Sequence, residues 1–245
     1  MLKFGNTYLN YNGTYLKALD PLNPLDLPPF TIRLKYKEGV TPSFSKGMGV
    51  QVSQNPNVWD LTYENSDWNL MFIEDTDILE VLGANTTGIT NMDGLFHTCT
   101  YLSSVPLFDT SEVTNMDTMF TFCTRLSTVP LYDTSNVTSM EQMFSYTPSL
   151  TSVPLLDTHD VINMQGFFLD SNNLKYIPLF DTSNVTNMNA AFQGCRNVES
   201  GALALYQQAS SQANVPRHEH TFLVCGDNTQ TGSAELAQIP WDWQY

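Results

Sequence analysis

Residues 133–140 are Asp-Thr-Ser-Asn-Val-Thr-Ser-Met, and residues 181–188 are Asp-Thr-Ser-Asn-Val-Thr-Asn-Met. The motif belongs to a repeat in which several residue types recur every 24 positions without an insertion or a deletion. Internal similarity at a fixed period is typical of repeat proteins, in which neighbouring units bury one another's apolar faces. The repeated positions are Asp109, Asp133, Asp157 and Asp181; Met92, Met116, Met140, Met164 and Met188; Phe96, Phe120, Phe144, Phe168 and Phe192; and Pro106, Pro130, Pro154 and Pro178.

Each repeat contains two apolar patterns. Leu102-x-x-Val105-x-Leu107 has the spacing of the strand of a leucine-rich repeat. The positions that follow have helical spacing, at steps of three and four residues, and they are Val113, Met116, Phe120 and Cys123. We therefore predict an α/β fold, a leucine-rich-repeat solenoid of 24-residue rungs, each with a strand, a turn and a short helix.

The rest of the chain does not share the repeat. Residues 1–76 contain the alternating segment Phe30-Thr-Ile-Arg-Leu-Lys-Tyr-Lys and two similar strand-like stretches near the N-terminus, so we expect a small β-rich module that serves for attachment. Residues 77–200 are the predicted solenoid. Residues 201–245, which begin with a helical pattern, are expected to cap its last rung.

The composition excludes several classes of protein. The chain has 25 acidic side chains, 10 Lys and Arg residues and a formal charge of −15. A general nucleic-acid-binding protein needs clustered basic residues, so we expect no nucleic-acid partner. The sequence also has no long apolar run, and thus neither a predicted membrane-spanning helix nor a secretory signal.

The repeated aspartates suggest either a row of calcium ligands or a row of turn residues. Repulsion between carboxylates about 5 Å apart costs roughly 0.8 kcal/mol in a water-like dielectric. Hydrogen bonds from backbone N–H groups of the same turn contribute about 1.5–3 kcal/mol to a charged acceptor, enough to offset that repulsion without a metal. We predict turn residues and no metal.

The cysteines and histidines suggest no cofactor either. Cys99, Cys123 and Cys195 occupy one repeat position that Thr147 and Ser171 fill elsewhere, so we expect a small inward site with free, buried thiols. His218, His220 and Cys225 could belong to a zinc site, but the sequence offers no further ligand at metal-site spacing. With no nucleophile elbow, phosphate loop or paired-carboxylate motif, we expect no catalytic residues and no enzymatic activity.

The outward side of the predicted strands is the better candidate site. Alternation along a strand would send Val105 and Leu107 inward and leave Ser104, Pro106 and Phe108 facing outward, with their equivalents in the other repeats. An outward apolar row of this length indicates a partner site, unless the rings cover one another or the N-terminal module covers them. The predicted partner-binding residues are Ser104, Phe108, Thr128, Tyr132, Ser152, Leu156, Tyr176 and Phe180.

These repeats resemble the BspA-type leucine-rich repeats of bacterial surface proteins, whose signature is Asp-Thr-Ser-x-Val-Thr-x-Met followed by Met-Phe and Cys. Residues 133–140 and 181–188 match it closely. The resemblance implies an adhesion or binding protein without catalytic residues, and similar arrays occur in proteins that bacteriophages encode. Members on the cell surface usually carry a signal or a lipid anchor.

We therefore expect a non-enzymatic virion component of a bacteriophage, because a protein that reaches the outside by assembly and lysis needs no signal. Its partners would be a protein or glycan on the host surface, or other virion proteins. The alternatives are a bacterial cell-surface adhesin that binds a host protein or glycan, and a cytoplasmic interaction scaffold.

Overall fold

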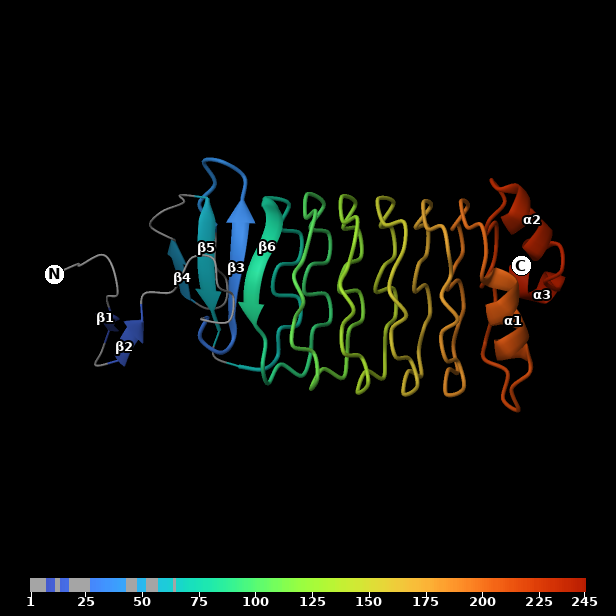
Figure 1. Cartoon of the computed structure of the whole chain (residues 1–245), viewed down its shortest axis with the longest axis horizontal. Coiled ribbons are helices and arrows are strands. Elements are labelled where there is room, and N and C mark those ends of the chain that lie inside the picture. The colour runs from blue at the N-terminus through green and yellow to red at the C-terminus, as the bar shows by residue number, and fades with distance from the viewer. Residues whose placement is uncertain (1–7, 12–13, 18–26, 43–47, 52–56, 64) are drawn as a thin grey trace.

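The repeats form a stack of coils, one coil for each 24-residue repeat. In the computed structural model, which describes residues 8–11, 14–17, 27–42, 48–51, 57–63 and 65–245, the coils lie side by side along the longest axis of the molecule (Figure 1). They extend from the strand β6 (Ile78–Asn85) to the helix α1 (Ala202–Ser210).

Backbone hydrogen bonds join each coil to both of its neighbours. The N–H of Met116 donates to the carbonyl of Ser139 in the next coil at 3.1 Å, and the N–H of Met140 donates to Asn163 at 3.0 Å. Isolated parallel bridges connect the same position of successive coils, from Asp67 through Asn91, Asn115, Ser139, Asn163 and Asn187 to Arg217. The backbone is therefore satisfied between coils, which a single repeat cannot do alone.

The expected α/β leucine-rich-repeat solenoid of strand–turn–short-helix rungs is wrong. In residues 86–200, all of which the structure describes, there is neither a helix nor an extended strand, only turns and isolated bridges. The regular elements of the described residues are a two-stranded hairpin, a four-stranded antiparallel sheet and three short helices.

Proline explains why the predicted strands do not form. Pro106 and its equivalents Pro130, Pro154 and Pro178 have no N–H, so a ladder of hydrogen bonds through this position would be interrupted in every coil. Side chains bridge the coils beside it instead, because the Thr110 hydroxyl donates to the Asp133 carbonyl at 2.7 Å and the Thr134 hydroxyl donates to Asp157 at 2.6 Å.

Left-handed residues explain why the predicted helices do not form. Thr118 has a φ of 51° and Phe122 a φ of 61°, and the equivalent positions of the other coils also have positive φ. The backbone therefore follows a series of turns in which N–H groups alternate between two acceptors. The N–H of Phe120 donates to Met143 of the next coil, whereas that of Thr121 donates back to Thr118. The apolar residues with helical spacing therefore lie on a series of turns.

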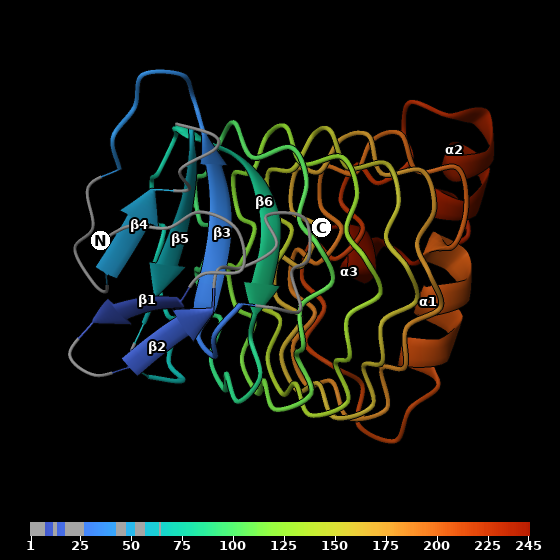
Figure 2. The same cartoon turned by 60° about the vertical axis from the view of Figure 1, so that its left-hand side comes forward.

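The N-terminal end of the stack is an antiparallel sheet in the order β4 (Met48–Gln51), β5 (Val58–Thr62), β3 (Thr31–Tyr36), β6. A separate hairpin pairs β1 (Tyr8–Tyr11) with β2 (Thr14–Lys17). On its other edge, β6 bonds the first full coil, since the N–H of Val81 donates to the carbonyl of Ser104 at 3.2 Å. Figure 2 shows the sheet continuing directly into the coils. The domain boundary that we expect at residue 76 stays a prediction.

A column of phenylalanine rings fills the core. One ring from each coil is buried, and each stacks on the next with centroids 5.2–5.9 Å apart. The column comprises Phe72, Phe96, Phe120, Phe144, Phe168, Phe192 and Phe222. The repeated methionines are buried beside it, and Met116, Met140 and Met164 have no exposed surface.

The C-terminal segment covers the other end of the column. α1, α2 (Gln230–Leu236) and α3 (Trp241–Gln244) lie against the last coils (Figure 1). Trp243 is buried and stacks on Phe222 with centroids 6.2 Å apart, and its carbonyl accepts a hydrogen bond from the N–H of Phe222. The last ring of the column is thereby removed from water.

Replacing Met140 by aspartate should destabilise the protein strongly. Met140 is fully buried, so the substitution places a carboxylate among apolar side chains with no basic partner. We expect the free energy of unfolding to fall by more than about 3 kcal/mol. Urea unfolding followed by circular dichroism measures it. The control is Ile162→Asp, at a position that is 49% exposed. Equal midpoints for the two variants would contradict the buried position of Met140.

Candidate functional site

Four leucines at one repeat position are exposed to solvent, and we call them the leucine ladder. Leu107 is 64% exposed, Leu131 and Leu155 are each 60% exposed, and Leu179 is 55% exposed. They occupy four successive coils, whose backbones in a parallel bridged arrangement lie about 4.8 Å apart. Single exposed leucines are common on protein surfaces, but a row of four on neighbouring coils is a contiguous apolar surface.

The structure places half of the predicted partner-binding residues in the core. Phe108, Tyr132 and Leu156 are each 2% exposed and Phe180 is fully buried, so the expectation that they face outward is wrong. The rings of Phe108 and Tyr132 stack with centroids 5.6 Å apart. The other predicted residues, Ser104, Thr128, Ser152 and Tyr176, are exposed. Their role in binding stays a prediction.

The error has a physical cause. The alternation that placed Ser104 and Phe108 on one face applies to an extended strand, and this segment is not one. The prolines gave the signal that could have corrected it. With a strand excluded at Pro106, Leu107 and Phe108 have no assigned faces, and the larger, ring-bearing residue is the better candidate for the core.

A row of aspartates runs beside the leucine ladder, two residues further along each coil. These are Asp109, Asp133, Asp157 and Asp181, the aspartate row. The predicted turn role is confirmed, because each carboxylate accepts the backbone N–H of the second residue after it at 2.9–3.3 Å. In two coils the serine hydroxyl of that residue also donates at 2.7 Å, from Ser111 and from Ser135.

These hydrogen bonds lower the pKa of three of the aspartates. The Ser111 and Ser135 hydroxyls hold the pKa of Asp109 and of Asp133 below the ordinary value, and the backbone N–H of Ser183 does so for Asp181. The four segments that carry the ladder and the row, residues 104–114, 128–138, 152–162 and 176–186, contain Glu112 and Asp160 in addition and contain no lysine or arginine. The leucine ladder therefore lies beside a fixed negative charge.

The cysteines occupy the buried site that the repeat predicted. Cys99, Cys123 and Cys195 are free and buried, and each thiol donates to a phenylalanine carbonyl at 3.1 Å. Desolvation raises the pKa of these thiols, which leaves them protonated and weakly nucleophilic. In the two other coils Thr147 and Ser171 donate to the carbonyl of Phe144.

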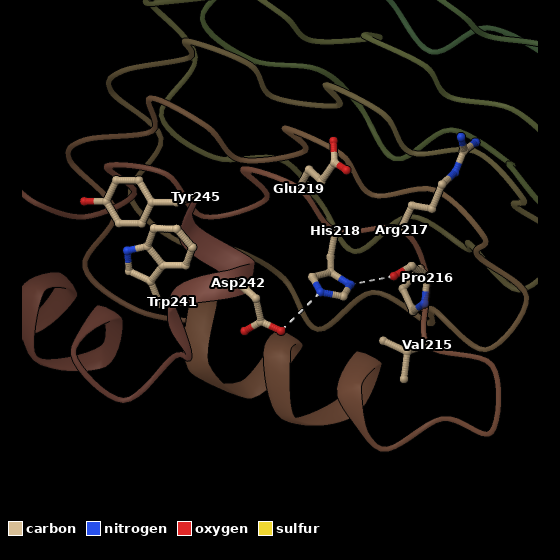
Figure 3. A pocket seen from close by; sticks show the side chains of 8 residues that line it. All are labelled: Val215, Pro216, Arg217, His218, Glu219, Trp241, Asp242 and Tyr245. Carbon is tan, nitrogen blue, oxygen red and sulfur yellow. Dashed lines mark hydrogen bonds and ion pairs between the residues drawn. The ribbon is translucent and has the colours of Figure 1, made fainter.

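The histidine cluster is dispersed. His218 Nδ1 lies 2.8 Å from the Pro216 carbonyl and its Nε2 lies 3.6 Å from a carboxylate oxygen of Asp242 (Figure 3). Cys225 is buried in the core, whereas His220 is exposed. Within the described residues, no three His, Cys, Asp or Glu side chains gather at metal-binding geometry. Among the residues that the structure describes, no helix has the length and apolarity that a membrane-spanning helix needs.

Removing the Ser135 hydroxyl should raise the pKa of Asp133. A depressed pKa in the folded state stabilises the protein above the pKa of the unfolded chain, about 3.9, and this stabilisation is lost as the pH falls through the folded value. We therefore expect Ser135→Ala to lose stability at neutral pH relative to the unmodified protein, and the difference to vanish in acid.

Titration of the carboxylate carbons by NMR measures this pKa directly. The control is Ser127→Ala, an exposed serine that donates to no carboxylate among the described residues. An unchanged Asp133 pKa in Ser135→Ala would show that the hydroxyl does not hold the carboxylate in its turn.

Comparison with known proteins identifies a family. Residues 66–175 and 149–215, together more than half of the chain, match the family described as "Mycoplasma protein of unknown function, DUF285". No curated protein and no solved structure is significantly similar to the chain. The match includes the coils that carry the leucine ladder and the aspartate row, and the chain therefore belongs to this family of BspA-like repeat proteins.

Proposed function

We propose that this protein is a non-enzymatic binding protein that holds a protein partner on the leucine ladder. The carrying observation is the repeated exposure of Leu107, Leu131, Leu155 and Leu179 on four adjacent coils. Leaving this surface in water gives the free protein no stability, whereas covering it contributes roughly 1 kcal/mol for each leucine.

The coils hold the ladder in a fixed arrangement before any partner arrives. The Thr110 hydroxyl donates to the carbonyl of Asp133 in the next coil, and the Thr134 hydroxyl donates in the same way to the carbonyl of Asp157. Phe108 and Tyr132, which follow Leu107 and Leu131 in the chain, stack on each other in the core. Binding therefore orders little of this backbone, which lowers the entropic penalty of association.

The aspartate row restricts the type of partner. A partner that covers the leucines also approaches ionised Asp109, Asp133 and Asp181, and the surrounding segments offer it no lysine or arginine. Complementary charge increases the rate of association and disfavours wrong partners. We therefore expect a protein surface that carries both apolar and basic side chains, and not a second copy of this acidic chain.

The polar side chains of the repeats support a binding role over a catalytic one. The aspartates accept hydrogen bonds in their own turns, the threonines bridge coils and the thiols donate to buried carbonyls. Each of these groups is explained by the stack itself, so none of them is needed for chemistry.

Site-specific crosslinking tests the proposed surface. A photo-reactive phenylalanine analogue at position 131 should crosslink one basic protein in the cells or particles that contain this protein, whereas the same analogue at position 73 should not. Combined replacement of the four leucines by serine should weaken binding of that protein at least tenfold. The matched control replaces the exposed Leu70 and Ile73 by serine. Equal binding by both variants would contradict the proposal.

Where the protein is located, in a virion or on a cell surface, is a separate proposal. A bacteriophage virion component remains our leading hypothesis, and a cell-surface adhesin is the alternative. Mass spectrometry of purified particles beside fractionated host cells distinguishes them, since we expect the protein in the particles. Recovery from the cytosol alone would contradict both settings and favour an interaction scaffold.

A further inference from the structure

We propose that the C-terminal cap carries a second, independent binding site, for a neutral hexose unit of an oligosaccharide. The site is an open hollow beside α3, and its walls come from α3 and from the loop that leads into the last coil (Figure 3). The residues that carry the argument are Arg217, His218, Glu219, Trp241, Asp242 and Tyr245.

The first observation is an exposed aromatic platform. Trp241 is 71% exposed and Tyr245 is 53% exposed, and their rings stack with centroids 5.2 Å apart and an interplanar angle of 23°. The same chain buries Trp68 completely and leaves Trp243 only 3% exposed. Trp and Tyr combine an apolar ring with a polar N–H or O–H group, and they are enriched at binding interfaces.

The second observation is a fixed floor. The His218 ring stacks on buried Trp243 with centroids 4.2 Å apart and an interplanar angle of 10°. Its Nδ1 contacts the Pro216 carbonyl at 2.8 Å, and its Nε2 faces Asp242 at 3.6 Å. The floor is therefore formed before a ligand binds, and the imidazole of His218 and the carboxylate of Asp242 face each other in the lining of the hollow (Figure 3).

The third observation is a polar rim with free hydrogen-bonding capacity. Among the described residues, the side chains of Arg217, Glu219, Trp241 and Tyr245 make no hydrogen bond or ion pair within the chain. Arg217 contributes donors only, Glu219 acceptors only and the Tyr245 hydroxyl both. Such a rim can satisfy hydroxyl groups, each of which donates one hydrogen bond and accepts others.

These three features together favour a sugar over other ligands. Nucleic acid is disfavoured by the carboxylates of Glu219 and Asp242 and by the formal charge of −15. An aromatic cage for an organic cation needs rings that surround the cation, whereas Trp241 and Tyr245 stack on each other, so that their outer faces point in opposite directions. A purely apolar ligand would leave the charged rim unpaired. A neutral hexose offers an apolar C–H face to the platform and hydroxyls to the rim.

The indole N–H signals of the four tryptophans provide the readout by NMR. The probes are cellotriose, laminaritriose, maltotriose, the trimer of N-acetylglucosamine and lactose, with glycerol and tetramethylammonium chloride as comparison ligands. We expect at least one of the sugars to shift the Trp241 signal in a saturable manner, and neither comparison ligand to do so. No shift by any of the sugars at millimolar concentration would overturn the proposal. A shift by tetramethylammonium alone would also overturn it.

Variants then locate the site, with sugar binding measured by isothermal titration calorimetry because replacing Trp241 removes its NMR signal. Trp241→Ala and Tyr245→Ala should each weaken sugar binding at least tenfold, and Trp241→Phe, which keeps a ring, should weaken it less. The matched control is Phe122→Ala, since Phe122 is also an exposed aromatic residue, at 38%, but lies on the coils. Glu219→Gln, at the exposed rim, should also weaken binding and does not remove any packed group. Binding that survives both Trp241→Ala and Glu219→Gln would overturn the site.

Discussion

Every coil depends on hydrogen bonds to the coil beside it. In an extended sheet or a helix the backbone is satisfied within one element or between neighbouring strands, but here the N–H of Met140 reaches Asn163 and the N–H of Met116 reaches Ser139. A coil removed from the stack would lose these partners and expose its phenylalanine ring at the same time. Polar and apolar burial therefore favour the same arrangement, and the period of 24 residues is the condition for both.

This dependence of each coil on its neighbours explains how much of the fold could be predicted from the sequence. The repeat phase identifies the stacked units, and the recurrent Met and Phe positions identify core residues such as Met140 and Phe144, which are fully buried. The local backbone was not accessible in the same way, because helical spacing of apolar residues does not distinguish a helix from a series of turns. What decides between them is the positive φ at Thr118 and Phe122. Threonine and phenylalanine carry no sequence signal for that conformation, and the signal lies in the equivalent glycines of other coils, Gly94, Gly166 and Gly194.

The candidate site was affected by that local error more than the core was. A shift of one position exchanges a buried residue for an exposed one, and the assumption of a strand assigned Phe108 to solvent and Leu107 to the core. The apolar type of Leu107 and Phe108 was recognised, but which of the two faces solvent was not. The aspartates were predicted more accurately because their function is local: an Asx turn needs only its own N–H two residues later, whatever the surrounding backbone does.

The stack also determines what kinds of surface this protein can present. Any residue at a repeated position is displayed as a row, so the leucine ladder and the aspartate row form a long surface that suits an extended partner with several contacts. Trp241 and Tyr245 of the C-terminal cap lie outside the coils, and they can form an arrangement that occurs once, a platform that lines one hollow together with His218. That platform can exist because Trp243 already closes the end of the phenylalanine column, which leaves the neighbouring Trp241 without a structural role in the core. A periodic surface and a single hollow thus occur on one chain at separate places, the coils and the C-terminal cap, and can be occupied independently.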